Sequence, residues 1–157
     1  MAAVTDRASF REANDVDLPE IIALLAEDTI PAGREDASLP LDKCYERAFA
    51  AIQADPNQRL IVAELDGRVV GCLQLTFIPG LAFRGAWRGL IESVRIASDL
   101  RGLRLGEALI GHAVEKSRAF GCRMVQLTSS KSRADAHRFY ERLGWARSHE
   151  GFKLTLE

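Results

Sequence analysis

Two arginines and two glycines lie close together in the segment D-L-R-G-L-R-L-G-E-A-L, residues 99–109. The segment joins a strand-like run that ends at Ala97 to a helix-like pattern that begins at Leu105. The first N–H groups of a helix have no partner within the helix, and the helix dipole makes that end positive. Glycine lets the backbone approach a ligand, and Arg101 and Arg104 add positive charge. The combination is typical of a phosphate site; a plain loop with solvated arginines is the alternative.

Other familiar sites are absent from the sequence. There is no G-x-x-x-x-G-K-[ST], which argues against a P-loop hydrolase, and no G-x-G-x-x-G after a first strand, which argues against a dinucleotide fold. The three histidines show no metal-site spacing, so we expect no metal. We expect Cys44, Cys72 and Cys122 to be buried free thiols.

Length and composition predict one soluble globular domain over residues 1–157. The chain is 47% hydrophobic and 27% charged, with a net charge of -1. This balance argues against nucleic-acid or membrane-surface binding. No apolar run reaches the ~20 residues that span a bilayer, and the first ten residues do not resemble a secretory signal. Together with the reduced cysteines, these features predict a cytoplasmic protein.

Apolar periodicity and turn residues predict the element order β-α-α-β-β-β-α-β-α-β-β, a mixed α/β sheet. The predicted strands cover 8–13, 59–65, 68–77, 90–96 and 123–129, and a last hairpin covers 145–156. The predicted helices cover an apolar face from Leu18 to Leu25, then 45–54, 105–120 and 132–142.

Several local signals fix the ends of these elements. Asp66-Gly67 predicts a tight hairpin turn. Asp17 with Glu20 has the spacing of a capping box, and Ser132 is a candidate cap for the last helix.

The segment that follows the strand ending at Ile96 resembles the Q/R-x-x-G-x-G/A signature of the GCN5-related N-acetyltransferases (GNAT). In that family the signature cradles the pyrophosphate of acetyl-CoA. Arg101 and Gly106 keep the frame, and Gly102 supplies an R-G pair that many members carry. Arg104 replaces the central glycine, and as a non-glycine residue it is expected to keep φ below zero.

A second resemblance lies in S-K-S-R-A-D-A-H-R-F-Y-E-R-L-G-W, residues 130–145. It is similar to the family block N-x-x-A-x-x-x-Y-x-x-x-G-F. Ala136, Tyr140 and Gly144 keep the frame, while Arg133 replaces the asparagine. The resemblance covers residues 8–156 and is weakest over 28–60, where family members differ most.

The resemblance implies an α/β GNAT fold in one domain. Its mixed, mostly antiparallel sheet would have six to seven strands, splayed between strands 4 and 5 and flanked by about four helices. It implies transfer of acetyl from acetyl-CoA to the primary amine of a small molecule, and a homodimer is possible. A protein N-terminal or lysine acetyltransferase is the alternative, and a non-catalytic CoA-binding module is an alternative of another class.

Two residues are candidates for proton transfer. In the family, the tyrosine at the position of Tyr140 donates a proton to the departing sulfur; a core-packing role is the alternative. Glu92 is the candidate base, because it would share an otherwise apolar strand face with Val94 and Ile96, where burial would raise its pKa. An exposed or ion-paired Glu92, with deprotonation through water, is the alternative.

The remaining candidates are binding residues. The pantetheine arm is expected to pair with the backbone of Val94, Arg95 and Ile96. The diphosphate is expected at Arg101, Gly102, Leu103, Arg104, Leu105, Gly106 and Glu107. Further donor contacts are expected from Thr128, Ser132, Arg133 and Ala136. The acceptor pocket is expected between the 28–42 and 79–89 loops, with Arg34, Arg84, Trp87 and Arg88 as its residues.

Overall fold

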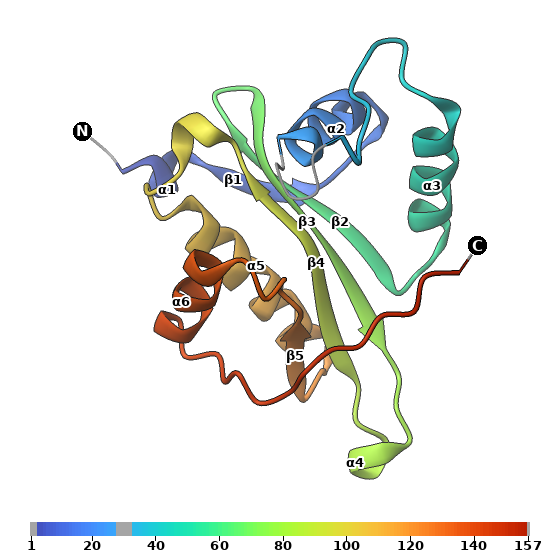
Figure 1. The fold of residues 1–157 in the computed structure, drawn as a ribbon, viewed down its shortest axis with the longest axis vertical. Helices are drawn as coiled ribbons and strands as arrows, with labels where there is room; N and C mark the ends of the chain where they lie inside the picture. Colours follow the sequence, from blue (N-terminus) through green and yellow to red (C-terminus); the bar gives the residue numbers. More distant parts are fainter. Residues whose placement is uncertain (1–2, 28–32, 157) are drawn as a thin grey trace. The chain divides into compact units, whose positions relative to one another are not determined.

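The computed structural model describes residues 3–27 and 33–156 of the chain (Figure 1). Contacts divide it into two compact units, residues 1–126 and residues 127–157. None of the helices in the described ranges is long and apolar enough to cross a membrane.

The sheet of the described residues has five strands in the order β1-β2-β3-β4-β5. Their bounds are β1 Ser9–Glu12, β2 Gln58–Leu65, β3 Arg68–Ile78, β4 Arg88–Ile96 and β5 Met124–Leu127. The first four are antiparallel neighbours, and β5 runs parallel to β4. The predicted turn between β2 and β3 is confirmed: Asp66 and Gly67 have φ of 52° and 79°, the paired positive values of a type I′ turn.

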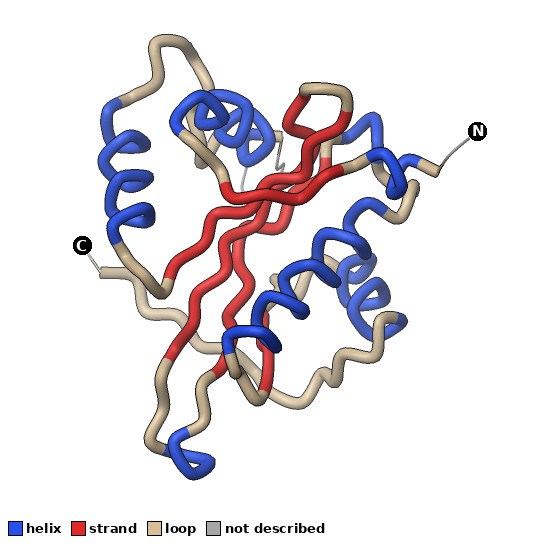
Figure 2. Tube along the Cα trace, turned by 180° about the vertical axis from the view of Figure 1, so that it is seen from behind, coloured by secondary structure: helices blue, strands red, loops and turns tan. Residues whose placement is uncertain are grey.

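Three helices enclose the sheet of the first unit. Helix α2 (Leu18–Ala26) and helix α3 (Lys43–Ala54) lie on one face, and helix α5 (Leu105–Phe120) lies on the other (Figures 1 and 2). The alternation of the strands explains this layering, because one set of alternate side chains is mainly apolar and lies under α5. The buried members of that set are Ile61, Leu73, Leu75, Phe77 and Ile91.

Helix α5 packs closely on β4 because β4 has a glycine at the contact. A Cβ atom on Gly89 would lie only 2.6 Å from the hydroxyl oxygen of Ser117. Ser117 is fully buried, and its hydroxyl donates to the Ala113 carbonyl at 2.9 Å. Gly121, at φ 98°, ends the helix as predicted.

The start of α2 is held by an ion cluster and not by the predicted capping box. Arg11 donates to both oxygens of Asp17, at 2.7 and 2.9 Å, and also to Glu64 at 2.6 Å. The Asp17 side chain makes no cap hydrogen bond to α2. Glu20 accepts from the Val69 amide at 3.1 Å, so the capping-box prediction is wrong.

Two further α-helices, α1 (Val4–Arg7) and α4 (Ala82–Gly85), have one turn each. The described residues contain six α-helices in all, whereas about four were predicted. The second unit contains helix α6 (Ala134–Arg142). Ser132 does not cap it, because its hydroxyl pairs with that of Ser130 at 2.9 Å.

The prediction of six to seven strands is too high, because the last hairpin does not form in the described part of the tail. Residues 145–156 contain no strand. A strand needs a partner strand for its backbone groups, and none of the described strands pairs with this segment. Its alternate apolar side chains Phe152, Leu154 and Leu156 are 94%, 86% and 84% exposed.

Candidate active site

The loop before α5 has the shape of an anion-binding turn. Gly102 and Arg104 have φ of 80° and 63°, so the chain passes twice through the left-handed region before α5 begins at Leu105. The expectation of a negative φ at Arg104 is therefore wrong. The residue keeps the backbone conformation that glycine adopts without cost, and the first amides of α5 lie just beyond it.

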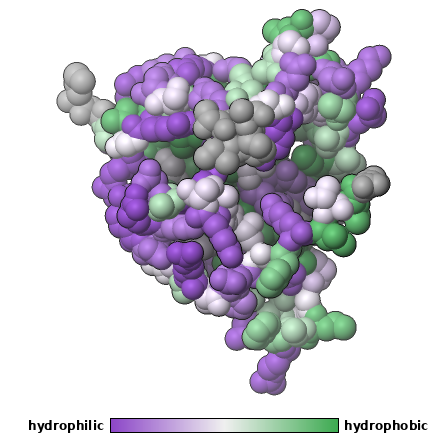
Figure 3. All heavy atoms as spheres, in the orientation of Figure 1, coloured by the Kyte–Doolittle hydropathy of each residue, from purple (hydrophilic) through white to green (hydrophobic). Residues whose placement is uncertain are grey.

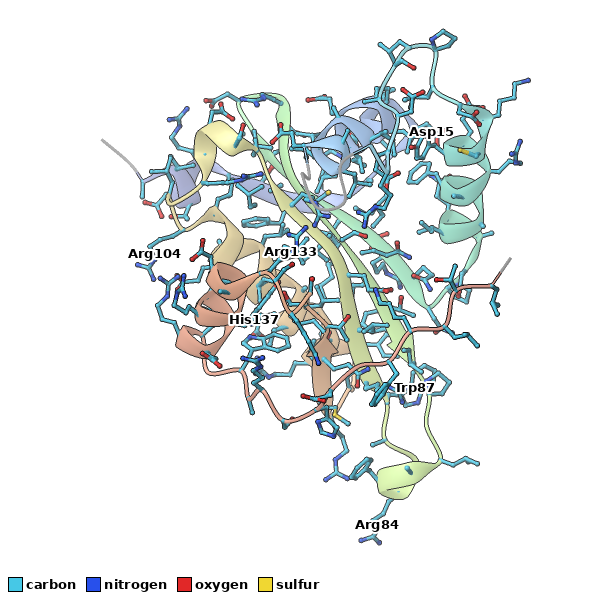
Figure 4. The ribbon with its side chains drawn as sticks, in the orientation of Figure 1. Asp15, Arg84, Trp87, Arg104, Arg133 and His137 are labelled. Atoms are coloured by element: carbon cyan, nitrogen blue, oxygen red, sulfur yellow. The ribbon has the colours of Figure 1, made fainter. Side chains whose placement is uncertain are left out.

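The two arginines of this loop are tied to acidic neighbours. Arg104 donates to both oxygens of Glu107, at 3.0 and 2.7 Å, while its side chain stays 75% exposed beside the start of α5 (Figure 4). Arg101 lies 3.8 Å from the Glu27 carboxylate and donates to the Ile96 carbonyl at 3.3 Å. Each arginine of the loop therefore has a carboxylate beside it.

Strand β4 contains a bulge that the sequence did not reveal. Gln74 lies opposite Glu92 and Cys72 lies opposite Arg95, so three steps along β4 match two along β3. Ser93 lies inside the bulge with φ 55°. A bulge disrupts the ladder locally, and here the Ser93 carbonyl accepts from the Cys72 thiol at 3.8 Å and the Val94 carbonyl from the Arg95 guanidinium at 2.7 Å.

The bulge also changes which side chains share a face. Residues directly opposite each other on antiparallel strands point the same way, so Glu92 and Arg95 lie on the face of Gln74 and Cys72. Ile96 lies opposite Gly71, on the α5 side. The prediction that Glu92 shares an apolar face with Ile96 is therefore wrong, and Glu92 is exposed and not buried.

A cavity of about 130 Å³ lies between the sheet and helices α2 and α3. Its walls are mainly apolar side chains from the two helices, and its floor is formed by strands β2, β3 and β4. The lining residues are Leu18, Ile21, Ile22, Leu25, Tyr45, Ala48, Phe49, Ile52, Leu60, Cys72, Gln74 and Ser93. Ala48 and Ser93 are exposed, so the cavity opens to solvent beside the bulge.

The polar groups of the cavity are held in place by hydrogen bonds. Gln74 donates its amide to the Gln58 side-chain oxygen at 3.0 Å, and Thr76 donates to the same oxygen at 2.9 Å. Tyr45 donates to Glu35 at 3.0 Å. Neither Gln74 nor Tyr45 was predicted to be a site residue. For Gln74 the available signal was the alternation of polar residues along β3, an otherwise apolar strand.

The cysteine on the cavity floor is not a nucleophile. Cys72 is 1% exposed, and burial raises the pKa of its thiol to about 12. A thiol with that pKa is protonated at neutral pH, whereas the thiolate is the reactive form. Of the other cysteines Cys122 is half-buried, and Cys44 is exposed, so the prediction that all three are buried is wrong for Cys44.

The predicted acceptor residues do not gather at this cavity. Trp87 packs edge-on against Phe120 of α5 at 5.2 Å, which is the opposite face of the sheet. Arg84 lies in α4 at the tip of the β3–β4 hairpin, away from α2 and α3 (Figure 4). Arg88 lies at the first position of β4, opposite Ile78. Arg34 pairs with Glu35 at 3.0 Å in the loop before α3; residues 28–32 of that loop lie outside the described residues.

The tip of the β3–β4 hairpin is apolar and tightly turned. Phe83, Arg84 and Gly85 all have positive φ, of 53°, 62° and 76°. Leu81 and Phe83 are 99% and 73% exposed, and apolar atoms gather at this end of the molecule (Figure 3). The predicted long loop is therefore a hairpin extension with a left-handed turn at its end.

The second unit holds the candidate acid. Tyr140 lies in α6 and is half-buried, with its ring edge-on to Phe139 at 5.1 Å and to Trp145 at 5.9 Å. The Trp145 amide donates to the Tyr140 carbonyl, and Gly144 has φ 87°, which ends the helix as predicted. Arg133 immediately precedes α6, Ala136 lies in its first turn, and Thr128 is exposed after β5.

Comparisons with known proteins agree with these features. The sequence profile described as "Acetyltransferase (GNAT) family" matches residues 19–145. An aminoalkylphosphonate N-acetyltransferase of Salmonella typhimurium is 33% identical over 114 residues, 73% of each chain.

Two solved structures extend the likeness over nearly the whole chain. A protein of Bacillus halodurans C-125, described as a transcriptional regulator, has a TM-score of 0.92 and 44% identity, over 95% of this chain and 99% of its own. An acetyltransferase of Trypanosoma brucei has a TM-score of 0.77 and 28% identity, over 95% and 99%. The chain belongs to the GNAT acetyltransferase family and is an N-acetyltransferase.

Proposed function

We propose that this chain transfers the acetyl group of acetyl-CoA directly to the primary amine of a small molecule. The observation that carries the proposal is the left-handed turn at Gly102 and Arg104, which leads into the free amide end of α5 beside the bulged strand β4. The family match over residues 19–145 includes parts of both compact units, which supports one acetyltransferase domain.

The donor fits the residues of the first unit. Phosphate oxygens suit the amides of Leu105, Gly106 and Glu107 and the charges of Arg101 and Arg104, because all of these donate to anions. The interruption of the β3–β4 ladder at the bulge suits a pantetheine arm, whose amide groups would pair with the backbone of Val94, Arg95 and Ile96. Acetyl-CoA would supply the activated acetyl group. From the second unit we propose Thr128, Ser132, Arg133 and Ala136 as further contacts.

The state of Cys72 supports direct transfer. An acetyl group carried on Cys72 would require its thiolate, and the raised pKa of Cys72 keeps that thiol protonated. In direct transfer the amine nitrogen attacks the acetyl carbon, and the carbon–sulfur bond breaks as coenzyme A leaves. Glu92, on the cavity face of β4, accepts the proton of the amine directly or through water, and the Tyr140 hydroxyl donates a proton to the sulfur.

The size of the cavity favours a small acceptor. A volume of about 130 Å³ between α2, α3 and the sheet admits a compact molecule. The aminoalkylphosphonate N-acetyltransferase from Salmonella typhimurium is named for a small amine, which supports the same class. A protein N-terminus or lysine side chain is the alternative acceptor.

The test combines donor binding, turnover and one substitution. We expect calorimetry to show acetyl-CoA binding, and free thiol to appear when a small primary amine is added. Tyr140→Phe is expected to lower kcat by about 10- to 1000-fold with an unchanged Kd for acetyl-CoA, because only the proton donor is removed. A protein that ignores millimolar CoA contradicts the proposal, and an unchanged kcat removes Tyr140 from the mechanism.

A further inference from the structure

We infer that Tyr45 determines the size of the amine that this chain accepts. Its ring forms part of the wall of the cavity between α2, α3 and the sheet, and its hydroxyl holds the described part of the loop before α3, residues 33–42. The inference rests on the proposed function and adds a specificity-determining residue to the same site.

The ring of Tyr45 belongs to the side of α3 that faces the cavity. Tyr45, Phe49 and Ile52 are spaced by four and three residues, which places them on one side of the helix, and all three line the cavity. Phe49 is 5% exposed, whereas Tyr45 is half-buried. The Tyr45 ring therefore lies nearer to solvent than the Phe49 ring, where an entering acceptor would meet it first.

The hydroxyl of Tyr45 fixes this ring in place. It accepts from the Asp36 amide at 2.9 Å and donates to the Glu35 carboxylate at 3.0 Å. Glu35 is itself held by Arg34, whose Nε donates to it at 3.0 Å. A phenol has one proton to donate, and here Glu35 receives it. Rotation of the ring away from the cavity would break both hydrogen bonds.

The loop that Tyr45 holds also packs against the cavity wall. Two of its apolar side chains contact the buried cluster between α2 and α3, and these are Ala37 and Leu41 against Leu18, Ile22 and Phe49. The three residues of the cluster line the cavity. An acceptor too large for the cavity would have to displace the Tyr45 ring and, with it, the loop. Tyr45 thus makes the binding of large amines unfavourable.

The first experiment compares amines that differ by one phenyl group. The probes are n-propylamine with 3-phenylpropylamine, and 2-aminoethylphosphonate with 2-amino-1-phenylethylphosphonate, so that the size test covers uncharged and anionic acceptors. A cavity of about 150 Å³ admits benzene alone, so the phenyl-bearing amines exceed the about 130 Å³ present here. We expect Tyr45→Ala to shift the kcat/KM ratio within a pair at least about tenfold toward the larger amine, with an unchanged KM for acetyl-CoA.

The second experiment tests the hydroxyl by itself. Tyr45→Phe keeps the ring and removes both hydrogen bonds to the loop. We expect KM for the smaller amine to rise about threefold to tenfold at unchanged kcat, the range of one lost hydrogen bond, while the size ratio stays close to that of the parent. Glu35→Ala is expected to have a similar effect, and the double variant no larger effect than either change alone, because both remove the same contact. Effects that multiply contradict the inference.

The control is Arg47→Ala, because Arg47 is a large exposed residue of α3 outside the described lining of the cavity. It is expected to leave the size ratio unchanged. A folded Tyr45→Ala protein with the parent's ratio overturns the inference and leaves the proposed function in place; if that variant does not fold, Tyr45→Leu decides in the same way. Absence of thiol release with all four amines, from a protein that binds acetyl-CoA, overturns the proposed function and with it the inference.

Discussion

Arg104 occupies a backbone conformation that most side chains avoid, and its side chain is held by Glu107 in the first turn of α5. The left-handed φ of 63° opens the turn toward the helix amides, while the paired carboxylate puts a negative charge where an anion is proposed to bind. The two effects oppose each other, since one presents the site and the other weakens its positive potential.

Removal of the Glu107 charge is expected to strengthen donor binding. Glu107→Gln frees Arg104 for the diphosphate and removes repulsion, so we expect the Kd for acetyl-CoA to fall about twofold to fivefold, the range of an exposed ion pair. Calorimetry at two salt concentrations measures the effect, which shrinks at high salt. The matched control is Glu115→Gln, because Glu115 pairs with Arg118 at the same spacing on α5 but far from its start. A weaker Kd for Glu107→Gln contradicts the interpretation.

Glycine at position 104 is expected to stabilise the protein. Arg104→Gly removes the steric cost of a left-handed non-glycine residue, so we expect Tm to rise by about 2–4 °C. Arg104→Ala keeps that cost and is expected to leave Tm at or below the starting value. Thermal unfolding of both variants measures the difference. Equal Tm values for Gly and Ala would mean that the turn changes shape on substitution.

Among the elements, the ion cluster of Arg11, Asp17 and Glu64 joins β1, the turn before α2 and β2. Asp17 is 4% exposed, and the Arg11 guanidinium lowers the pKa of its carboxyl below the usual value. A carboxyl whose folded pKa is lowered stabilises the fold above its unfolded pKa of about 3.9, and loses that contribution as the pH falls through the folded value.

The pH dependence of unfolding tests this cluster. Asp17→Asn is expected to lower Tm by several degrees at pH 7, because Arg11 loses a buried partner, and the difference from the parent protein is expected to shrink below about pH 4. Thermal unfolding between pH 2 and 7 measures both curves. Asp99→Asn is the control, since Asp99 makes a similar two-bond pair with Arg68 but is 57% exposed. A pH-independent difference for Asp17→Asn contradicts the linkage.

The sequence predicted elements better than the irregularities within them. Hydrophobic alternation located β2, β3 and β4, and the 3.6-residue period located α5 from Leu105 to Phe120. The bulge at Ser93 could not be predicted, because no glycine or proline marks it and the register arises from pairing with β3. For that reason Glu92 was predicted on the correct strand, but the residues predicted to share its face of the sheet were wrong.

The candidate site was predicted where local chemistry defines it and missed where packing does. The Arg101–Glu107 turn is continuous in sequence, so its helix start and glycine could be recognised directly. The cavity is assembled from five elements, and its Tyr45, Gln74 and Ser93 are brought together only by the fold. Trp87 was expected to form part of the acceptor pocket, yet it completes an aromatic cluster with Phe77 and Phe120.

For the whole molecule, direct transfer predicts that no acetyl group remains on the protein. After incubation with acetyl-CoA alone, peptide mass mapping is expected to find Cys72 unmodified. Cys72→Ala is expected to keep kcat within about threefold, because the protonated thiol takes no part in bond formation. A stable acetyl group on Cys72, or a loss of turnover in a folded Cys72→Ala protein, would falsify direct transfer.

The contrast between Cys44 and Cys72 also gives the chain two internal reporters. Cys44 is open to solvent on α3, while Cys72 is closed beneath α2 at the cavity floor. A thiol-reactive dye should therefore label Cys44 within minutes, which measures the amount of protein. It should label Cys72 only when α2 and α3 move apart. An acceptor bound between α2 and α3 would slow the labelling of Cys72, so the occupancy of the cavity could be measured without acetyl transfer.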